Sequence, residues 1–383
     1  MPAIVAVSAV VEDWSASAPF PHAGADGRIG WDEIMDPMTE AVARRRPLRR
    51  ARALLFVVVF ALLALVIAVR TKSGPASGPC SNPIRPFPSG TVLDAQWSVD
   101  SPPDDATYDL TGVKSIAYPA SSHPSSSVFA LGDGVAAART CFVGGVLKGS
   151  ADETQTWEYF HDTYNAACLR IVATDRMQVR DLRCDSVEDG LRPRESSENA
   201  NDVTMRVSGT YFTRVRDDCL ENDGAIGGVL FDSLWEQCNT GISERPSSAM
   251  GSWTSPANET LTLDHMLIGL YETPHAEGGL GENALFKWSS SANHLVIQCS
   301  IFKVDDVSLN GADAMNIPEG TVVDDGACPN DPSTIVWLGE GEYPATTAGL
   351  RVTKDVTVWE AAVAGWKCAH GYGPCPSPAA TKS

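Results

Sequence analysis

Arg216-Asp217-Asp218-Cys219-Leu220-Glu221-Asn222-Asp223-Gly224 lies at the centre of three successive segments that share one pattern of apolar and polar residues. The segments cover residues 179–191, 207–219 and 230–242. In each of them a run of alternating apolar residues leads into a turn that contains Asp or Asn. A degenerate repeat of roughly 20 to 35 residues with this character is typical of a strand solenoid. We therefore expect the segments to stack side by side as parallel strands.

Composition and charge restrict the classes of function. The chain has 383 residues, of which 43% are hydrophobic and 20% are charged, and this balance excludes a wholly disordered protein. The net charge is −19, and residues 1–52 contribute none of it because their seven basic and seven acidic residues cancel. A surface this acidic argues against a nucleic-acid partner, since phosphate binding needs a basic face.

The N-terminal part of the chain predicts a membrane anchor. We expect residues 1–52 to be a largely disordered cytoplasmic tail, which ends with six arginines among residues 44–52. The uncharged run Ala53–Val69 would span about 26 Å as a helix, just enough for the hydrocarbon core of a bilayer. Basic residues dominate the N-terminal flank, so the positive-inside rule predicts a single-pass type II protein with its C-terminal part extracellular or luminal.

The remaining chain divides into a stalk, a solenoid and a final helix. Residues 70–90 are rich in Pro, Ser and Gly and predict a spacer, and residues 91–354 predict the β-helix ectodomain. In residues 355–383, Val356, Trp359, Val363 and Trp366 recur at helical spacing, and Asp355 precedes them as an N-cap. A solenoid must cover its open end, so we expect this helix to cap the C-terminal end.

The cysteines and one sequon indicate an oxidising compartment. All ten cysteines lie between Cys80 and Cys375, beyond the predicted membrane span, which favours disulfides over buried thiols. Spacing alone does not pair them, although Cys368 and Cys375 could close a short loop. Asn258 begins the single N-glycosylation sequon, in a turn rich in Pro, Ser and Gly.

Several short motifs resemble right-handed parallel β-helix proteins of the pectin-lyase-like superfold. The motifs include Glu188-Asp-Gly-Leu191, Arg216-Asp-Asp-Cys-Leu220, Asn239-Thr-Gly-Ile242, Trp157-Glu-Tyr-Phe-His161 and Phe286-Lys-Trp288. More closely, the chain looks like a group of uncharacterised β-helix proteins over about residues 115–367. The resemblance implies an all-β fold, a right-handed parallel β-helix solenoid, and leaves the activity open.

Part of a polygalacturonase-like pattern is present. Enzymes of that kind carry an Asp on one rung and Asp-Asp-Cys on the next, which Asp189 and Asp217-Asp218-Cys219 match. They also carry Gly-His-Gly one rung later and Arg-x-Lys beyond it. Here the next rung offers Gly241-Ile-Ser-Glu244, and the nearest basic candidate, Arg351-Val-Thr-Lys354, comes much later. The chain therefore departs from the hydrolase pattern in two of its four elements.

The predicted register brings the acidic residues together. If Leu191, Cys219 and Ile242 form an inward stack, Asp218 points outward, with Asp217 at the strand mouth and Asp189 about 4.8 Å away on the next rung. Mutual repulsion would raise the pKa of at least one carboxyl. This register leaves Glu221 inward without a partner, and a one-residue shift would cure that fault while moving Asp218 inside.

These residues support three interpretations. As a polysaccharide hydrolase or lyase, the chain would use Asp217 and Asp218 as acid and base with Asp189 in support, and Arg192, Arg194 and Arg245 to hold an acidic polysaccharide or cell-surface glycan. As a Ca²⁺ site, it would use the oxygen ligands of Asp217, Asp218 and Asp223. As a non-catalytic surface or structural protein, it would need no cofactor and show these side chains satisfied by one another.

Overall fold

The structure is a computed structural model that describes residues 80–118, 127–150, 152, 154–195, 203–246, 259–289 and 292–375. These residues belong to one compact unit, Pro75–Ser383. The predicted tail, the predicted span Ala53–Val69, most of the stalk and the sequon at Asn258 lie outside the described residues. Among the residues that are described, no helix has the length and apolar character needed to cross a membrane.

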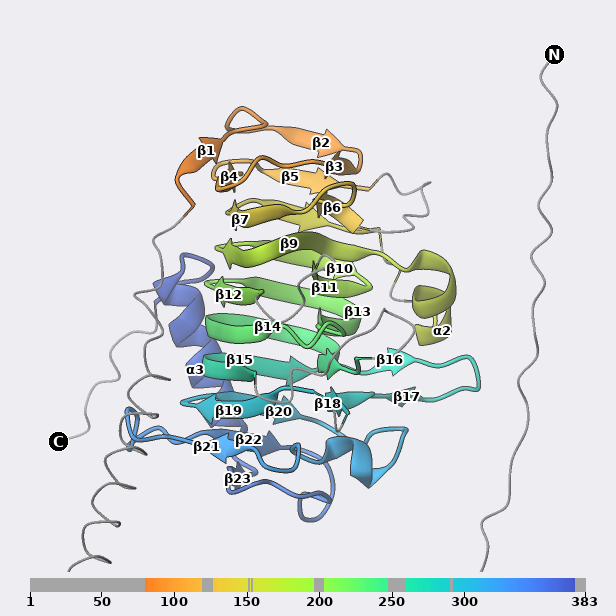
Figure 1. The fold of residues 1–383 in the computed structure, drawn as a ribbon. Coiled ribbons are helices and arrows are strands. Elements are labelled where there is room, and N and C mark those ends of the chain that lie inside the picture. The colour runs from red at the N-terminus through yellow and green to blue at the C-terminus, as the bar shows by residue number, and fades with distance from the viewer. Residues whose placement is uncertain are drawn as a thin grey trace, which may run out of the picture. The chain divides into compact units, whose positions relative to one another are not determined.

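Strands dominate the described residues, so the expected all-β class is confirmed (Figure 1). The strands are β1 (Asn82–Ile84), β2 (Val92–Asp94), β3 (Trp97–Val99), β4 (Ala106–Asp109), β5 (Ser115–Ala117), β6 (Ser127–Leu131), β7 (Ala137–Val143), β8 (Val146–Lys148), β9 (Ala167–Arg180), β10 (Arg183–Val187), β11 (Asp189–Glu195), β12 (Thr204–Ser208), β13 (Tyr211–Glu221), β14 (Gly227–Glu244), β15 (Thr260–Leu270), β16 (Thr273–Pro274), β17 (Leu280–Gly281), β18 (Ala284–Trp288), β19 (His294–Gln298), β20 (Ile301–Val304), β21 (Val322–Val323), β22 (Thr334–Trp337) and β23 (Arg351–Thr353). The helical elements are α2 (Trp157–Tyr159), the π-helical η1 (Phe160–Tyr164), the 3₁₀-helical η4 (Ala312–Met315) and α3 (Val356–Ala369).

The strands pair in three parallel ladders. The first ladder runs β1-β4-β7-β9-β12-β14-β15-β19-β21. The second runs β2-β5-β8-β10-β13-β14-β15-β20-β22-β23. The third runs β3-β6-β9-β11-β13-β14-β18. Long strands such as β9 and β14 belong to more than one ladder, and the short pair β16–β17 is antiparallel.

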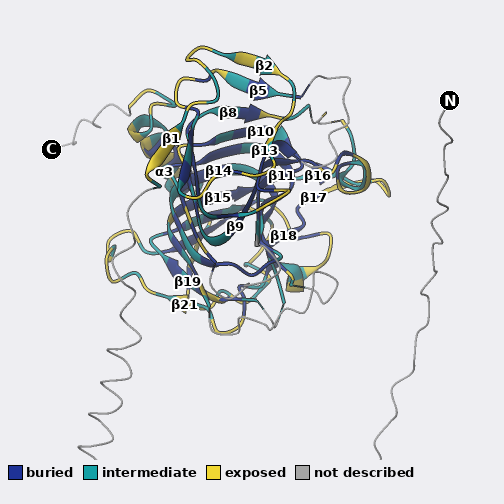
Figure 2. Ribbon diagram, turned by 45° about the horizontal axis from the view of Figure 1, so that its top comes forward, coloured by how far each residue is buried: buried dark blue, intermediate teal, exposed yellow. Residues whose placement is uncertain are grey.

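The expected lateral pairing of the three central segments is confirmed. Val207 lies beside Val179 on one side and Leu230 on the other, and both pairings are parallel. Side chains at such positions stack at the spacing of neighbouring strands, about 4.8 Å. The stacked apolar residues fill the interior between the ladders, while the exposed residues concentrate in loops and in the strands nearest the N-terminus (Figure 2).

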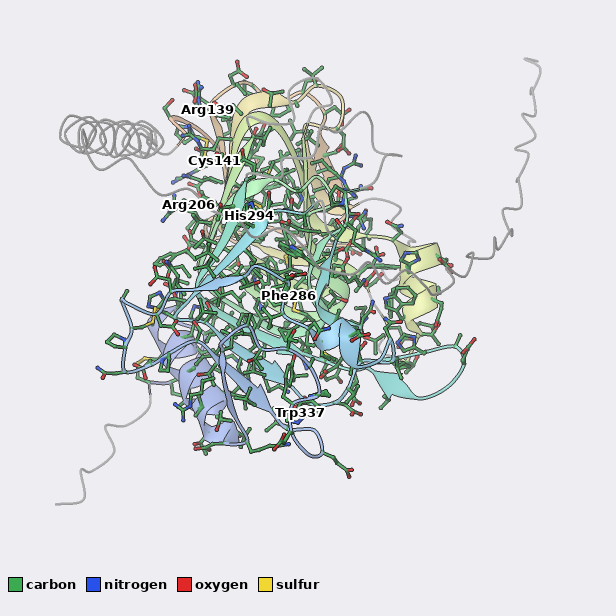
Figure 3. All side chains as sticks on the ribbon, turned by 60° about the horizontal axis from the view of Figure 1, so that its bottom comes forward. Arg139, Cys141, Arg206, Phe286, His294 and Trp337 are labelled. Atoms are coloured by element: carbon green, nitrogen blue, oxygen red, sulfur yellow. A yellow bond between two sulfur atoms is a disulfide. The ribbon has the colours of Figure 1, made fainter. Side chains whose placement is uncertain are left out.

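The inward stack differs from the expected register by one residue. Leu191 pairs with Leu220 and Leu220 with Ile242, so Leu220 and not Cys219 joins the stack. The stack continues to Phe286, which Figure 3 labels. The cause is a register irregularity between Val215 and Asp218, which absorbs an extra residue in β13. The shift places Glu221 on the outward side, where Arg192 and Arg194 pair with it. The expected move of Asp218 into the interior is wrong, because Asp218 contacts Lys287 of the same outward row.

The ten cysteines form five disulfides, as the sequence predicts. Cys368 and Cys375 close the expected local loop. The other bonds join residues that are 16 to 61 positions apart in the chain: Cys80–Cys141, Cys168–Cys184, Cys219–Cys238 and Cys299–Cys328. Such bonds stabilise the fold mainly by restricting the unfolded chain.

Helix α3 forms where the sequence predicts it but does not cap the end of the stack. The Asp355 side chain accepts a hydrogen bond from the backbone N–H of Thr357 at 3.0 Å, as an N-cap should. The buried stripe of the helix packs along the flank of the second ladder (Figure 1). Its contacts there are Tyr211, Leu234, Leu267 and Val336. These residues form an apolar row on the outer face of that ladder. Burying this row under α3 is favourable because it removes apolar surface from water.

Candidate functional site

The candidate site lies on the third ladder, around an outward-facing row of charged residues. Glu221 pairs in register with Ser243, and Ser243 with Lys287. Arg192 precedes them in the same row, because its neighbour Leu191 pairs with Leu220. Residues in register point to the same side of a sheet, so β11, β13, β14 and β18 bring these side chains together.

Lys287 holds two of the predicted carboxylates. Its Nζ lies 2.8 Å from Oδ1 of Asp217 and 2.8 Å from Oδ1 of Asp218. All three side chains are less than 10% exposed. Burial alone would lower the pKa of Lys287, but the two carboxylates outweigh it and raise that pKa above its usual value. Lys287 is therefore a permanent cation that compensates two buried acidic residues.

Arg192 connects the rest of the acidic residues. Its guanidinium donates to the Asp189 carboxylate, pairs with Glu221, and lies 3.4 Å from Oε2 of Glu188. Arg194 adds a second cation, with Nη2 at 2.6 Å from Oε1 of Glu221. We name the eight residues of this connected network the buried charge network: Glu188, Asp189, Arg192, Arg194, Asp217, Asp218, Glu221 and Lys287.

Burial and charge separate the pKa values of the carboxyl groups. Burial raises the pKa of Glu188 to about 9 and that of Asp218 to about 7, with nearby carboxylates adding to the effect. The pKa of Asp189 is raised for the same reason. Burial also works to raise the pKa of Glu221, but Arg192 and Arg194 outweigh it and hold that pKa at about 2. The expected raised pKa in the acidic patch is therefore present.

A cleft of about 530 Å³ opens beside Lys287. Two indole rings, Trp157 and Trp288, line it together with polar and charged side chains. The other lining residues that bear on function are His161, Arg245, Asn283, Asn310 and Asp313. Because Lys287 belongs to both the cleft and the buried charge network, the carboxylates of Asp217 and Asp218 lie next to the cleft lining.

Local contacts hold Trp157 over the cleft. Thr156 is the N-cap of α2, and its side chain accepts a hydrogen bond from the N–H of Tyr159. The Trp157 ring stacks on His161 at 4.8 Å between centroids, and His275 of the β16–β17 hairpin lies at 5.9 Å with the same 26° tilt. The Glu158 carboxylate joins the hairpin by accepting from the backbone N–H of Ala276 at 2.8 Å. The α2–η1 segment and the β16–β17 hairpin, which both project from the ladders, therefore support each other.

The structure brings together most of the residues that the sequence singles out. Asp189 and Asp218 are adjacent, since Oδ1 of Asp189 accepts the backbone N–H of Asp218 at 3.0 Å. Arg192 pairs with Asp189 and Glu221, and Arg194 pairs with Glu221, so these arginines are engaged by carboxylates of the protein and are not among the residues that line the cleft. Arg245 does line the cleft and is exposed.

The predicted Ca²⁺ ligand set is not assembled as expected. Asp223 accepts hydrogen bonds from Ser243 and from the backbone of Arg245, while Asp217 and Asp218 share Lys287. The carboxylate oxygens that do converge belong to Glu188, Asp189 and Asp217, and these lie within 4.8 Å of one another. Glu188 was not predicted as a ligand, because in the sequence it appeared only as part of the turn motif Glu188-Asp-Gly-Leu191.

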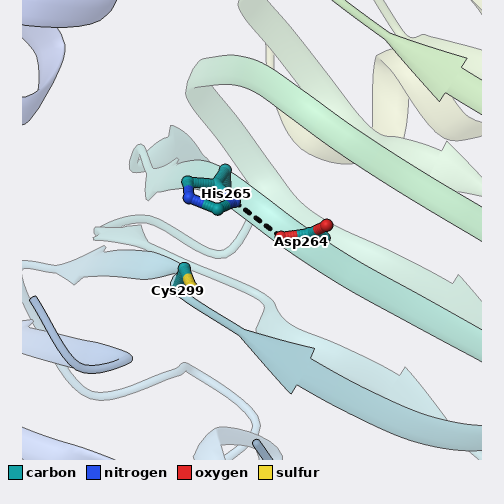
Figure 4. Close-up of side chains that lie close together, drawn as sticks. All are labelled: Asp264, His265 and Cys299. Carbon is teal, nitrogen blue, oxygen red and sulfur yellow. Dashed lines mark hydrogen bonds and ion pairs between the residues drawn. The ribbon is translucent and has the colours of Figure 1, made fainter. Parts of the chain in front are cut away.

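Asp264, His265 and Cys299 form a second convergent group (Figure 4). Asp264 and His265 belong to β15, and Cys299 directly follows β19. Nδ1 of His265 lies 2.6 Å from Oδ1 of Asp264. Cys299, however, is bonded to Cys328, and a disulfide sulfur is not the thiolate that a metal needs. We therefore assign no metal centre to this group.

Sequence reasoning missed Lys287, Trp157 and Trp288 as functional residues. Lys287 is 70 positions from Asp217 in the chain. The only signals were the motifs Trp157-Glu-Tyr-Phe-His161 and Phe286-Lys-Trp288, which stood out by resemblance alone.

Comparison with known proteins found no matching family, no matching curated protein and no matching solved structure. The geometry of the site therefore carries the functional argument by itself.

Proposed function

We propose that the described strands form a right-handed parallel β-helix of the pectin-lyase-like kind. Three parallel ladders that share the long strands β9, β13, β14 and β15 support this winding, because a chain reaches all three ladders only by coiling around a common interior. Parallel crossover connections are right-handed in about 98% of cases. The single-pass anchor at Ala53–Val69 belongs to the same proposal.

The cleft beside Lys287 binds a polysaccharide that carries carboxylate or sulfate groups. The observation that carries this proposal is that Trp157, Trp288 and Arg245 line one cleft. Indole faces offer large apolar surfaces to sugar rings, and a guanidinium binds carboxylate or sulfate with two parallel hydrogen bonds. Within the described residues, no ion pair engages the Arg245 guanidinium, so it is available to an acidic ligand.

Binding without cleavage fits the carboxylates best. A general acid and a general base must reach the scissile bond, yet Asp217 and Asp218 are about 4% exposed and both contact Lys287. Asp189 is likewise engaged by Arg192. Cleavage is the second candidate, favoured by the raised pKa of Asp218, about 7, which is the kind of value that a catalytic acid needs near neutral pH.

A glycan-array screen of the full-length protein, run with a uronan-degradation assay, tests both candidates. Trp157→Ala/Trp288→Ala should weaken binding of all retained glycans by at least about tenfold, since it removes both stacking surfaces. Arg245→Gln should weaken binding of acidic glycans alone. Trp97→Ala, a partly exposed indole of β3, is the matched control and should bind as wild type does.

The outcomes separate the candidates. Loss of uronan degradation in Asp217→Asn/Asp218→Asn, with binding retained, would establish catalysis in place of simple binding. Wild-type protein that retains no glycan, or a Trp157→Ala/Trp288→Ala variant that binds as well as wild type, would show that the cleft has no glycan role. A structural or interaction role for the ladders would then be the better interpretation.

The described part of the chain lies in an extracellular or luminal compartment under this proposal. The five disulfides support that location, because such bonds persist where the environment is oxidising. Protease treatment of sealed membrane vesicles that contain the full-length protein should digest the N-terminal tail from the cytoplasmic side only. Digestion of the disulfide-containing part from that side would refute the topology.

A further inference from the structure

We propose that Glu188, Asp189 and Asp217 bind one divalent cation of the Ca²⁺ type beneath the cleft. The carboxylate oxygens of these residues lie within 4.8 Å of one another, a separation that one ion can bridge. They come from the corner before β11, from β11 itself and from β13, so the ladder sets their spacing. The inference is independent of the glycan proposal, because it uses groups beneath the cleft and not those that line it.

The formal charge of the buried charge network leaves room for one such ion. Its five carboxylates, Glu188, Asp189, Asp217, Asp218 and Glu221, are opposed by three cations, Arg192, Arg194 and Lys287. In these ion pairs five carboxyl groups therefore share three cations. A divalent cation would supply the missing positive charge, since burial makes uncompensated carboxylates costly.

Two uncharged oxygen donors beside the carboxylates strengthen the assignment. Thr240 pairs in register with Asp218, and Asn239 precedes it, opposite the irregular part of β13 that contains Asp217. Both side chains are 0% exposed. Within the described part of the chain, the Thr240 hydroxyl and both polar atoms of the Asn239 amide have no hydrogen-bond partner. Buried amides are almost always partnered, and amide and hydroxyl oxygens are ligands that Ca²⁺ accepts.

The existing ion pairs leave carboxylate oxygens for the ion. Lys287 contacts Oδ1 of Asp217, and Arg192 approaches Oε2 of Glu188. A carboxylate has two oxygens and about four lone-pair sites, so one cation partner does not use all of them. An all-oxygen ligand set with no sulfur or imidazole selects Ca²⁺ or a similar hard ion over Zn²⁺.

Calcium titration of the full-length protein, first treated with EDTA and then dialysed, tests the site. Calorimetry should show one tight equivalent of Ca²⁺ per chain, and Ca²⁺ should raise the unfolding temperature in a concentration-dependent way. Glu188→Gln and Asn239→Ala should each weaken this binding by at least about tenfold. Asp223→Asn, which changes a carboxylate outside the convergent group, is the matched control and should bind Ca²⁺ as wild type does.

Glu188→Gln also has a second readout that protects the test against misfolding. Without Ca²⁺ its unfolding temperature should be at least that of the wild type, because glutamine has the same shape as the Glu188 side chain and carries no charge, while its response to Ca²⁺ is lost. Equal Ca²⁺ binding by wild type and Glu188→Gln would mean only diffuse binding to an acidic surface and would overturn the proposal. Absence of any tight equivalent in the wild type would overturn it as well.

Discussion

Replacing Lys287 with methionine tests whether the buried charge network excludes water. Methionine has nearly the same length and keeps the packing, but it removes the one cation that contacts both Asp217 and Asp218 at 2.8 Å. Those carboxylates then remain buried without that partner. Removing one member of a buried ion pair costs about 3–5 kcal/mol, so we expect Lys287→Met to lower the free energy of unfolding by that amount.

The assay is urea unfolding in EDTA, followed by tryptophan fluorescence, with the midpoint and slope both fitted. Lys367→Met is the matched control, because Lys367 pairs with Glu236 at 2.7 Å while both side chains remain about a quarter exposed. A pair this exposed contributes about 0–1 kcal/mol. The triple variant Lys287→Met/Asp217→Asn/Asp218→Asn should recover most of the loss. If Lys287→Met costs no more than Lys367→Met, water reaches the network and the reasoning fails.

Three further predictions concern other parts of the fold. Burial raises the pKa of Glu244 from 4.5 to about 7, so its contribution to stability is full below pH 4.5 and is lost as the pH rises to 7. In the wild type this loss should lower the free energy of unfolding by about 3 kcal/mol over that window, and urea unfolding at several pH values should show that Glu244→Gln lacks it. Replacing both cysteines of Cys80–Cys141, which are 61 residues apart, should cost about 4 kcal/mol, against about 2 kcal/mol for Cys368–Cys375, which are 7 apart; equal urea midpoints for the two alanine pairs would contradict this order. Asp355→Ala should destabilise α3 by about 1 kcal/mol, seen as earlier release of the Trp366 fluorescence signal in urea, whereas Asp355→Asn should retain the cap.

The parallel stacking was predictable because its cause is local and repeated. Apolar alternation in residues 179–191, 207–219 and 230–242 gives each segment one face to bury, and equal spacing of the turns aligns those faces. The exact register was not predictable. Cys219 and Leu220 are both apolar enough for the interior, and the irregularity between Val215 and Asp218 that decides between them has no signature in the sequence.

The site was only partly predictable for a related reason. Asp189, Asp217 and Asp218 are close in the chain or one repeat apart, so the repeat length brings them together. Lys287 is separated from Asp217 by 70 positions, and pattern alone does not count strands across so long a stretch. The flank position of α3 was not predictable either, because its apolar stripe would fit an end or a side of the stack equally well. The position is decided by the apolar row of Tyr211, Leu234, Leu267 and Val336, which α3 covers.

The position of α3 has a consequence for the order of synthesis. The apolar row that it covers is built from strands β13, β14, β15 and β22, all of which precede α3 in the chain and are synthesised before it. Until α3 is synthesised, Tyr211, Leu234 and Leu267 remain uncovered as an apolar stripe on the outer face of the ladder. A premature stop codon shortly before Asp355 would make that stripe permanent, and the truncated product should be held by chaperones or degraded even though every ladder could still form.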